Sequence, residues 1–177
     1  MSLRNMLASF ENIFLDRDGI INEVIMRDSV VSSPRSIDEF KFRSEIKEFV
    51  TALQKQNKKI FVVSNQPDIA RKKLTEENLK LMTDLIRNEL KINHISYCKH
   101  DNSDHCKCRK PLPGMLNHYL EIYNLSKSQS IMIGDSIKDI EAAKAAGIRA
   151  FLLETNYNKD VKKSVECTHI ANLRELL

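Results

Sequence analysis

The stretch Ile13-Phe14-Leu15-Asp16-Arg17-Asp18-Gly19 joins a short apolar run directly to two carboxylates that lie two residues apart. A short apolar run that ends abruptly at polar residues is typical of a buried strand in a parallel sheet. Two more runs end in the same way, because Ile60-Phe61-Val62-Val63 stops at Ser64 and Ile131-Met132-Ile133 stops at Gly134-Asp135. Sites in such sheets lie at the carboxyl ends of the strands, so we expect these polar residues to meet at one edge.

Helical patterns alternate with these runs. The helical segments are 46–53, 79–90, 112–120 and 137–146, and two further short strands are 95–97 and 150–153. We expect Ser44 and Thr75 to cap the first two helices, Pro111 to begin the third and Gly147 to end the fourth. The alternation predicts an α/β fold, a three-layer Rossmann-like arrangement in which helices cover both faces of a mostly parallel, five-stranded sheet.

The composition is that of one globular domain. The chain has 177 residues, of which 42% are hydrophobic and 29% charged, and these values exclude a wholly disordered chain. We expect a single domain over residues 1–177 without a large cap domain, in which residues 22–43 form a flap or hairpin and residues 98–108 a metal-binding loop. No apolar run reaches the roughly 18 residues of a membrane span, so the sequence favours a cytoplasmic protein, expected to be a monomer.

Acidic side chains follow two of the three strand-like runs. Asp16 and Asp18 come after the first run, and Asp135 comes after the third with Asp139 one helical turn further on. The first pair alone also suits a turn in which Asp side chains bond their own backbone. Carboxylates gathered at one sheet edge repel one another unless a cation lies among them, and Mg²⁺ is a hard ion held by carboxylates and a substrate phosphate. The pattern therefore predicts a magnesium site.

Three of the four cysteines fall within eleven residues, as Cys98-Lys99-His100 and, after a spacer of five residues, Cys106-Lys107-Cys108. Three thiolates and one imidazole form a closed tetrahedral set that selects Zn²⁺ and leaves no position open for catalysis. A disulfide is the alternative, but a reducing cytoplasm disfavours it. His105 adjoins Cys106, so one loop can hardly aim both at a single ion. We predict a structural zinc site formed by Cys98, His100, Cys106 and Cys108.

Four segments in order, over roughly residues 11–155, resemble the haloacid-dehalogenase-like phosphatase superfamily. The segments that match its four motifs are Asp16-Arg17-Asp18-Gly19, Ser64-Asn65, Lys110-Pro111, and Gly134-Asp135 with Asp139. The resemblance implies that Asp16 attacks the phosphorus and forms an aspartyl phosphate, and that Asp18 protonates the leaving oxygen and then deprotonates water. It also implies that Mg²⁺ binds Asp16, the backbone carbonyl of Asp18, and Asp135, with Asp139 either an anchor behind them or a direct ligand.

The same resemblance implies the phosphate-binding residues. Ser64 and backbone amides near Asn65 would donate hydrogen bonds to the phosphoryl oxygens, and Lys110 would supply a fixed positive charge. Arg109 precedes Lys110 directly, so the zinc loop would place both cations at the rim of the site.

The loop before Arg109 restricts the class of possible substrates further. It resembles the zinc loop of D-glycero-D-manno-heptose-1,7-bisphosphate phosphatases and is also similar to that of histidinol-phosphate phosphatases. Segments 64–71 and 109–116 favour the heptose group, whereas the short spacer favours the histidinol-phosphate group. Heptose enzymes often carry Lys after the fourth-motif Asp, where this chain has Ser136, so Arg27 or Arg109 would have to bind a second phosphate. The resemblance implies a small phosphorylated sugar as substrate, heptose bisphosphate first and histidinol phosphate as the alternative.

The sequence is less consistent with two other classes of function. A non-catalytic binding module is disfavoured because every residue of the four motifs is intact. A nucleic-acid 3′-end phosphatase is disfavoured because the net charge of +4 is dispersed along the chain and aromatic residues make up only 6% of it. We therefore expect neither a nucleic acid nor a membrane as a partner.

Overall fold

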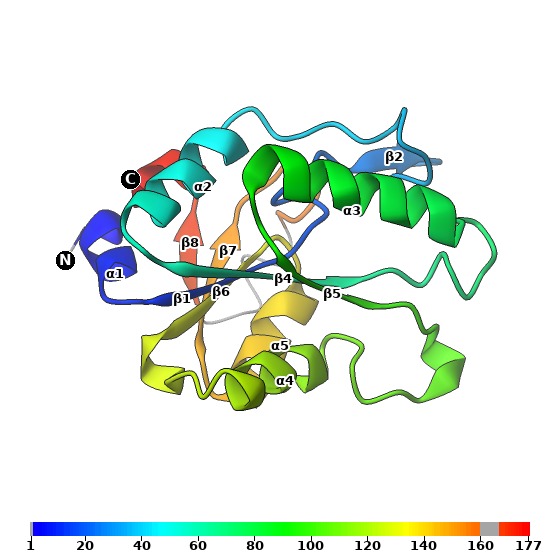
Figure 1. Ribbon diagram of the computed structural model, residues 1–177. Coiled ribbons are helices and arrows are strands. Elements are labelled where there is room, and N and C mark those ends of the chain that lie inside the picture. The colour runs from blue at the N-terminus through cyan, green and yellow to red at the C-terminus, as the bar shows by residue number, and fades with distance from the viewer. Residues whose placement is uncertain (1, 160–166) are drawn as a thin grey trace.

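The centre of the protein is a six-stranded parallel sheet in the order β5-β4-β1-β6-β7-β8 (Figure 1). The computed structural model describes residues 2–159 and 167–177. The strands are β1 (Asn12–Leu15), β4 (Lys59–Asn65), β5 (His94–Cys98), β6 (Ser130–Gly134), β7 (Arg149–Leu153) and β8 (Thr168–Ile170). The predicted α/β architecture is confirmed, and β1 lies between β4 and β6, so the three strands that end in polar residues are neighbours.

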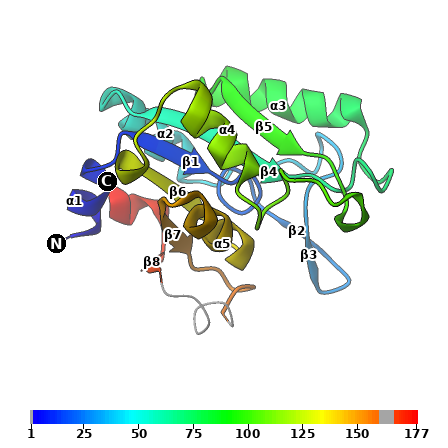
Figure 2. The ribbon, with the colours of Figure 1, turned by 90° about the horizontal axis from the view of Figure 1, so that it is seen from below.

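Helices cover both faces of the sheet (Figures 1 and 2). One face carries α1 (Leu3–Ala8), α2 (Ile46–Lys55) and α3 (Glu76–Leu90), and the other carries α4 (Gly114–Ile122) and α5 (Ile137–Ala146). Short 3₁₀ turns are η1 (Asn102–Asp104), η2 (Lys127–Gln129) and η4 (Leu173–Leu176). Because successive strand residues face opposite sides, Ile13 and Leu15 join the core under α2 and α3, whereas Phe14 joins the core under α4 and α5.

The structure departs from the sequence expectations at the element ends. Thr75 caps α3 and Gly147 ends α5 in the left-handed conformation, as predicted. The prediction for Ser44 is wrong, because Glu45 is the N-cap of α2 and the Ser44 hydroxyl donates to the Glu45 carboxylate. The prediction for Pro111 is also wrong, because a turn closed by Leu112 N–H to Arg109 C=O precedes α4. Helix α1 and strand β8 were not predicted.

Residues 22–43 contain the small hairpin that the length of this segment suggested. Strands β2 (Ile25–Arg27) and β3 (Val30–Ser32) pair antiparallel through a turn at Asp28 and Ser29, both with positive φ. The hairpin lies beyond the carboxyl ends of β4 and β5 (Figure 2). No large cap domain is present in the described chain, and within the same residues no helix is long and apolar enough to cross a bilayer.

Candidate active site

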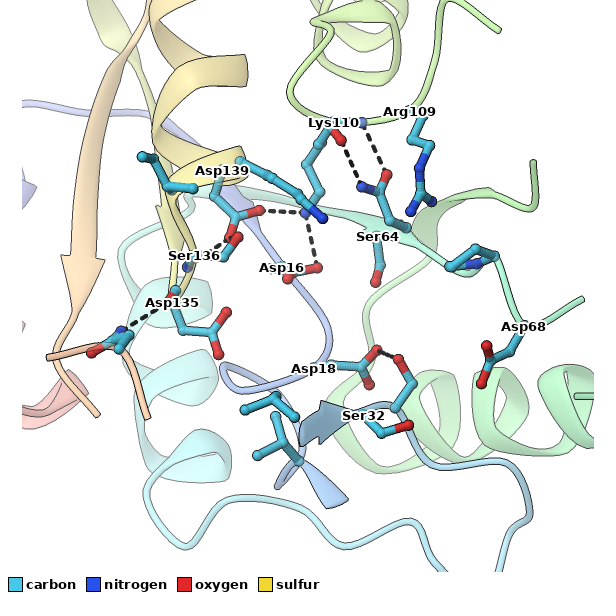
Figure 3. Close-up of a pocket in the computed structure, with 18 of the residues that line it drawn as sticks. Asp16, Asp18, Ser32, Ser64, Asp68, Arg109, Lys110, Asp135, Ser136 and Asp139 are labelled. Carbon is cyan, nitrogen blue, oxygen red and sulfur yellow. Dashed lines mark hydrogen bonds and ion pairs between the residues drawn. The ribbon is translucent and has the colours of Figure 1, made fainter. Parts of the chain in front are cut away.

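A buried lysine joins three elements at the carboxyl edge of the sheet (Figure 3). Lys110 Nζ lies 3.0 Å from Asp16 Oδ1, 2.5 Å from Asp139 Oδ1 and 2.8 Å from the Val63 carbonyl oxygen. Burial alone would lower the pKa of Lys110, but the Asp139 and Asp16 carboxylates outweigh it and hold the pKa well above its ordinary value. Lys110 is therefore a permanent positive charge directed at the end of β1.

Asp139 is held from two sides, as an anchoring residue would be. Lys110 occupies its Oδ1, and the backbone N–H and hydroxyl of Ser136 donate to its Oδ2 at 3.1 and 2.6 Å. Gly134 makes this packing possible, because a Cβ atom there would lie 2.3 Å from Asp139 Cβ. Although Asp139 lies close to the other acidic groups, these hydrogen bonds favour a role in positioning Lys110.

Asp135 follows β6, and a loop that the sequence did not single out holds it. The Tyr157 hydroxyl donates to Asp135 Oδ2 at 2.5 Å, and the Asn158 side-chain amide donates to the Asp135 and Leu153 carbonyl oxygens. Gly19 has φ of +85°, and a Cβ atom at this position would lie only 1.9 Å from Asp135 Oδ2. The first-motif loop and the carboxylate can approach each other only because residue 19 is glycine.

The three buried carboxylates Asp16, Asp135 and Asp139 fit a divalent cation. One oxygen of each lies within 4.8 Å of the others, and Lys110 neutralises only one of the three charges. Burial raises the pKa of Asp16 to about 6, although Lys110 opposes the shift, and burial together with Asp16 and Asp139 raises that of Asp135 well above its usual range. Among the described residues Asp16 Oδ2 and Asp135 Oδ1 accept no hydrogen bond, so both remain available to a hard cation.

The environment of Asp18 differs from that of Asp16. Burial raises its pKa, but the Arg17 guanidinium, at 2.9 and 3.1 Å, and the side chains of Ser33, Asn22 and Gln66 outweigh this effect and keep the pKa below its usual range. Arg17 is itself fully buried. Two carboxylates two residues apart therefore differ in acidity, which suits two different tasks.

The second-motif residues contribute in different ways. Ser64 is 1% exposed, lies in β4 and lines the cavity, with its hydroxyl group pointing into the cavity (Figure 3) and accepting a hydrogen bond from the Gln66 side-chain amide at 3.2 Å. The Asn65 side chain instead clamps the backbone of Lys110, donating to its carbonyl oxygen at 2.9 Å and accepting from its N–H at 3.0 Å. Asn65 lines the cavity, and its side-chain amide holds the lysine loop in place. That backbone amides near Asn65 bind the phosphate stays a prediction.

The Cys-His set of the zinc prediction comes together after β5. Cys108 Sγ lies 3.3 Å from His100 Nδ1, and Cys98 Sγ lies 3.6 Å from His100 Nδ1 and 3.6 Å from Cys106 Sγ. Zn–S bonds of about 2.3 Å and a Zn–N bond of about 2.0–2.1 Å give tetrahedral edges of roughly 3.6–3.8 Å. The spacing fits a tetrahedral zinc ion, and His105 is outside the set.

We expect the purified protein to hold about one zinc ion per chain, because four soft ligands already lie at tetrahedral spacing. Elemental analysis after dialysis against a weak chelator measures this content. A folded protein that contains no zinc and retains four reactive thiols would contradict the prediction.

A cavity of about 470 Å³ opens above these groups, between the hairpin and the zinc loop. Asp16, Asp18, Ser64, Arg109, Lys110, Asp135 and Asp139 line it, as predicted from the sequence, together with Asp68, Arg71, Lys138, Tyr157 and Asn158, which were not predicted. Arg27 is not among the lining residues, because its guanidinium is bound to Glu39, to the Ser32 hydroxyl and to the Ser33 carbonyl oxygen.

The fold and this arrangement of Asp16, Asp18, Ser64, Lys110 and Asp135 define a hydrolase of the haloacid dehalogenase-like class. A sequence model of the haloacid dehalogenase-like hydrolases matches residues 9–147, and the chain belongs to this family.

The chain is also similar to individual members of this family over most of its length. The chain is 34% identical over 157 residues to D-glycero-alpha-D-manno-heptose-1,7-bisphosphate 7-phosphatase of Photorhabdus laumondii, covering 81% of this chain and 82% of the relative. It is 34% identical over 152 residues to D-glycero-beta-D-manno-heptose-1,7-bisphosphate 7-phosphatase of Neisseria meningitidis serogroup A, covering 83% of this chain and 79% of the relative. A solved D,D-heptose 1,7-bisphosphate phosphatase from B. bronchiseptica, complexed with magnesium and phosphate, is 26% identical with a TM-score of 0.84 and covers 94% of this chain and 96% of its own.

Proposed function

We propose that the protein is a magnesium-dependent phosphatase that hydrolyses a phosphorylated sugar through an aspartyl-phosphate intermediate. The observation that carries this proposal is the position of Asp16, which ends the central strand 3.0 Å from a buried lysine and beside Asp135 at the bottom of an open cavity. Asp16 would attack the phosphorus atom while the bond from phosphorus to the ester oxygen breaks. Water then cleaves the acyl phosphate, which regenerates Asp16 and releases inorganic phosphate.

Asp18 would act as the acid and then as the base. Its low pKa keeps it ionised before substrate binds, and the arriving phosphate dianion favours its protonation because a nearby like charge raises the pKa of a carboxyl group. The proton passes to the leaving ester oxygen, and the ionised Asp18 later removes a proton from the attacking water. Ser33 and Gln66 hold Asp18 Oδ2 at 2.7 and 2.8 Å and so fix the direction of this transfer.

Lys110 and Ser64 would bind the transferring phosphoryl group. Lys110 is anchored by Asp139 and by Asn65, so its charge needs little reorganisation during the reaction. Mg²⁺ held by Asp16, Asp135 and the Asp18 carbonyl oxygen would neutralise charge on the phosphoryl oxygens when it is bound.

We assign D-glycero-D-manno-heptose 1,7-bisphosphate as the substrate and its 7-phosphate as the group removed. The relatives that match over four fifths of the chain support this assignment, and the Arg109 guanidinium at the cavity rim suits a second phosphate. Histidinol phosphate is the second candidate, favoured by the five-residue spacer between His100 and Cys106. It carries an imidazole ring and an ammonium group in place of a second phosphate, and a cationic rim disfavours the positively charged ammonium group.

A phosphate-release screen tests the assignment. The panel contains both anomers of the heptose bisphosphate, the heptose 7-phosphate, histidinol phosphate and a short 3′-phosphorylated DNA, each with and without Mg²⁺. We expect the bisphosphate to give the highest kcat/KM and activity to be lost in EDTA and restored by Mg²⁺. Faster release from histidinol phosphate or DNA would overturn the substrate, and full activity in metal-free buffer would overturn the mechanism.

We expect Tyr157→Phe to weaken magnesium binding, because the hydroxyl that orients Asp135 is removed. Loss of a partner that orients a metal ligand costs about 10–100-fold in metal affinity. Isothermal titration of Mg²⁺ and the Mg²⁺-induced rise in melting temperature measure the effect independently of turnover. Tyr123→Phe is the control, since that hydroxyl contacts His94 outside the cavity. Equal affinities in the two variants would contradict the role of Tyr157.

A further inference from the structure

Lys138 is a lysine at the cavity rim that the reaction described above does not use. It lies in the first turn of α5, is exposed, and lines the cavity beside Asp139. Its neighbour Asp139 faces inward to Lys110 and is fully buried, so the two adjacent side chains lie on different sides of the helix. Lys138 thus reaches the cavity from its open side, above the buried charges.

Lys138 and Arg109 lie on the same side of this opening. A smaller hollow behind the zinc loop is lined by Lys138, Arg109, Asn102 and Lys110, and the same four residues also line the main cavity. The residues common to both spaces mark their boundary. Figure 3 shows Arg109 and Lys110 on one side of the cavity, across from Asp18 and Ser32 on the hairpin side.

Neither of these rim cations forms an ion pair within the described residues, unlike the other cations lining the cavity. Asp101, whose pKa is lowered by its hydrogen bonds to Arg71 and also by the charge of Arg109, is paired with Arg71. Lys110 is paired with Asp16 and Asp139, and Arg71 is paired with Asp101 at 2.6 Å. Arg109 donates only to neutral acceptors, the Asn102 side chain and the His100 carbonyl oxygen. Lys138 has no hydrogen bond or ion pair within residues 2–159 and 167–177. Two unpaired positive charges therefore share one side of the opening.

We infer that Lys138, together with Arg109, binds the second, non-reacting phosphate of a bisphosphorylated sugar and so determines the preference for a bisphosphate. This inference rests on the proposed phosphatase function and deepens it. The residue directly after Asp135 is Ser136, which is uncharged and bound to Asp139. Arg27, the other cation considered for this task, is held by Glu39. Lys138 is the first cationic residue that follows Asp135 along the chain.

The test compares kcat/KM for heptose 1,7-bisphosphate with kcat/KM for heptose 7-phosphate. In Lys138→Ala we expect the ratio of the two to fall at least about tenfold, mainly through a higher KM for the bisphosphate, as is usual for the loss of a charged hydrogen bond. Lys138→Glu should lower the ratio further, because an anion then faces the phosphate, and Lys138→Arg should restore most of it.

The matched control is Lys144→Ala, which removes an exposed lysine from the last turn of the same helix, outside both hollows. An unchanged ratio in Lys138→Ala, or an equal fall in Lys144→Ala, would overturn the inference while the phosphatase function stands. If the wild-type protein releases phosphate from neither heptose, the proposed substrate fails and the inference fails with it. Unchanged melting temperatures show that each variant is folded.

Discussion

Asp16→Asn should abolish turnover, with kcat lower by roughly 10⁴-fold or more, while the protein stays folded. An amide cannot attack phosphorus, and no other carboxylate ends β1 between Lys110 and Asp135. Burial raises the pKa of Asp16 to about 6, so in metal-free buffer at neutral pH its charge destabilises the folded state and is lost in the variant. The melting temperature without metal should therefore be unchanged or higher.

The measurement pairs steady-state phosphate release with a rapid acid quench on labelled substrate. The wild-type protein should trap covalent phosphate during the first turnover, and Asp16→Asn should trap none. Glu121→Gln, which removes an exposed carboxylate on α4, controls for purification and for the loss of one negative charge. Full phosphate release by folded Asp16→Asn would show that Asp16 is not the nucleophile.

Secondary structure was predictable where the local pattern of apolar residues matches the burial of the element in the folded protein. β1, β4 and β6 are short runs buried on both faces of the sheet, so their continuous apolar residues marked them directly. Strand β8 was missed because only three residues pair with β7, and α1 was missed because only Leu7 of its six residues is buried. α4 starts late because the turn that carries Lys110 takes up the residues after Arg109.

The position of a site residue was predictable from the sequence where the residue directly follows a strand. It was less predictable where contacts between distant parts of the chain determine where the side chain lies. Asp16, Ser64 and Asp135 lie at strand ends, and parallel strands place those ends together. The engagement of Arg27 by Glu39 depends on how the hairpin closes over twelve residues, which no local pattern reveals. Tyr157 lies in a loop whose sequence resembles an ordinary turn, and only its contact with Asp135 marks it.

The second large effect is expected when zinc binding to the loop of residues 98–108 is disrupted. Cys106→Ser removes one of four ligands without touching a group that contacts the phosphate. Structural zinc is worth about 10–16 kcal/mol in isolated peptides, comparable with the stability of a whole domain. Here, however, the loop extends from a sheet with its own apolar core, and only Cys98 of the four ligands is fully buried. Loss of the ion should therefore disorder the loop and leave the sheet folded.

The loop holds the cations in place through specific contacts. Arg109 is bound to Asn102 and to the His100 carbonyl oxygen, and Asp101 holds Arg71 from the same loop. A misplacement of about 1 Å can cost 10²-fold in rate, so kcat/KM should fall about 100-fold in Cys106→Ser while the melting temperature falls by only a few degrees. Cys167→Ser, which alters a cysteine outside the zinc set, is the control for thiol removal. Undiminished activity in a variant shown to lack zinc would mean that the loop does not position these cations, and global unfolding would mean that the ion supports the core.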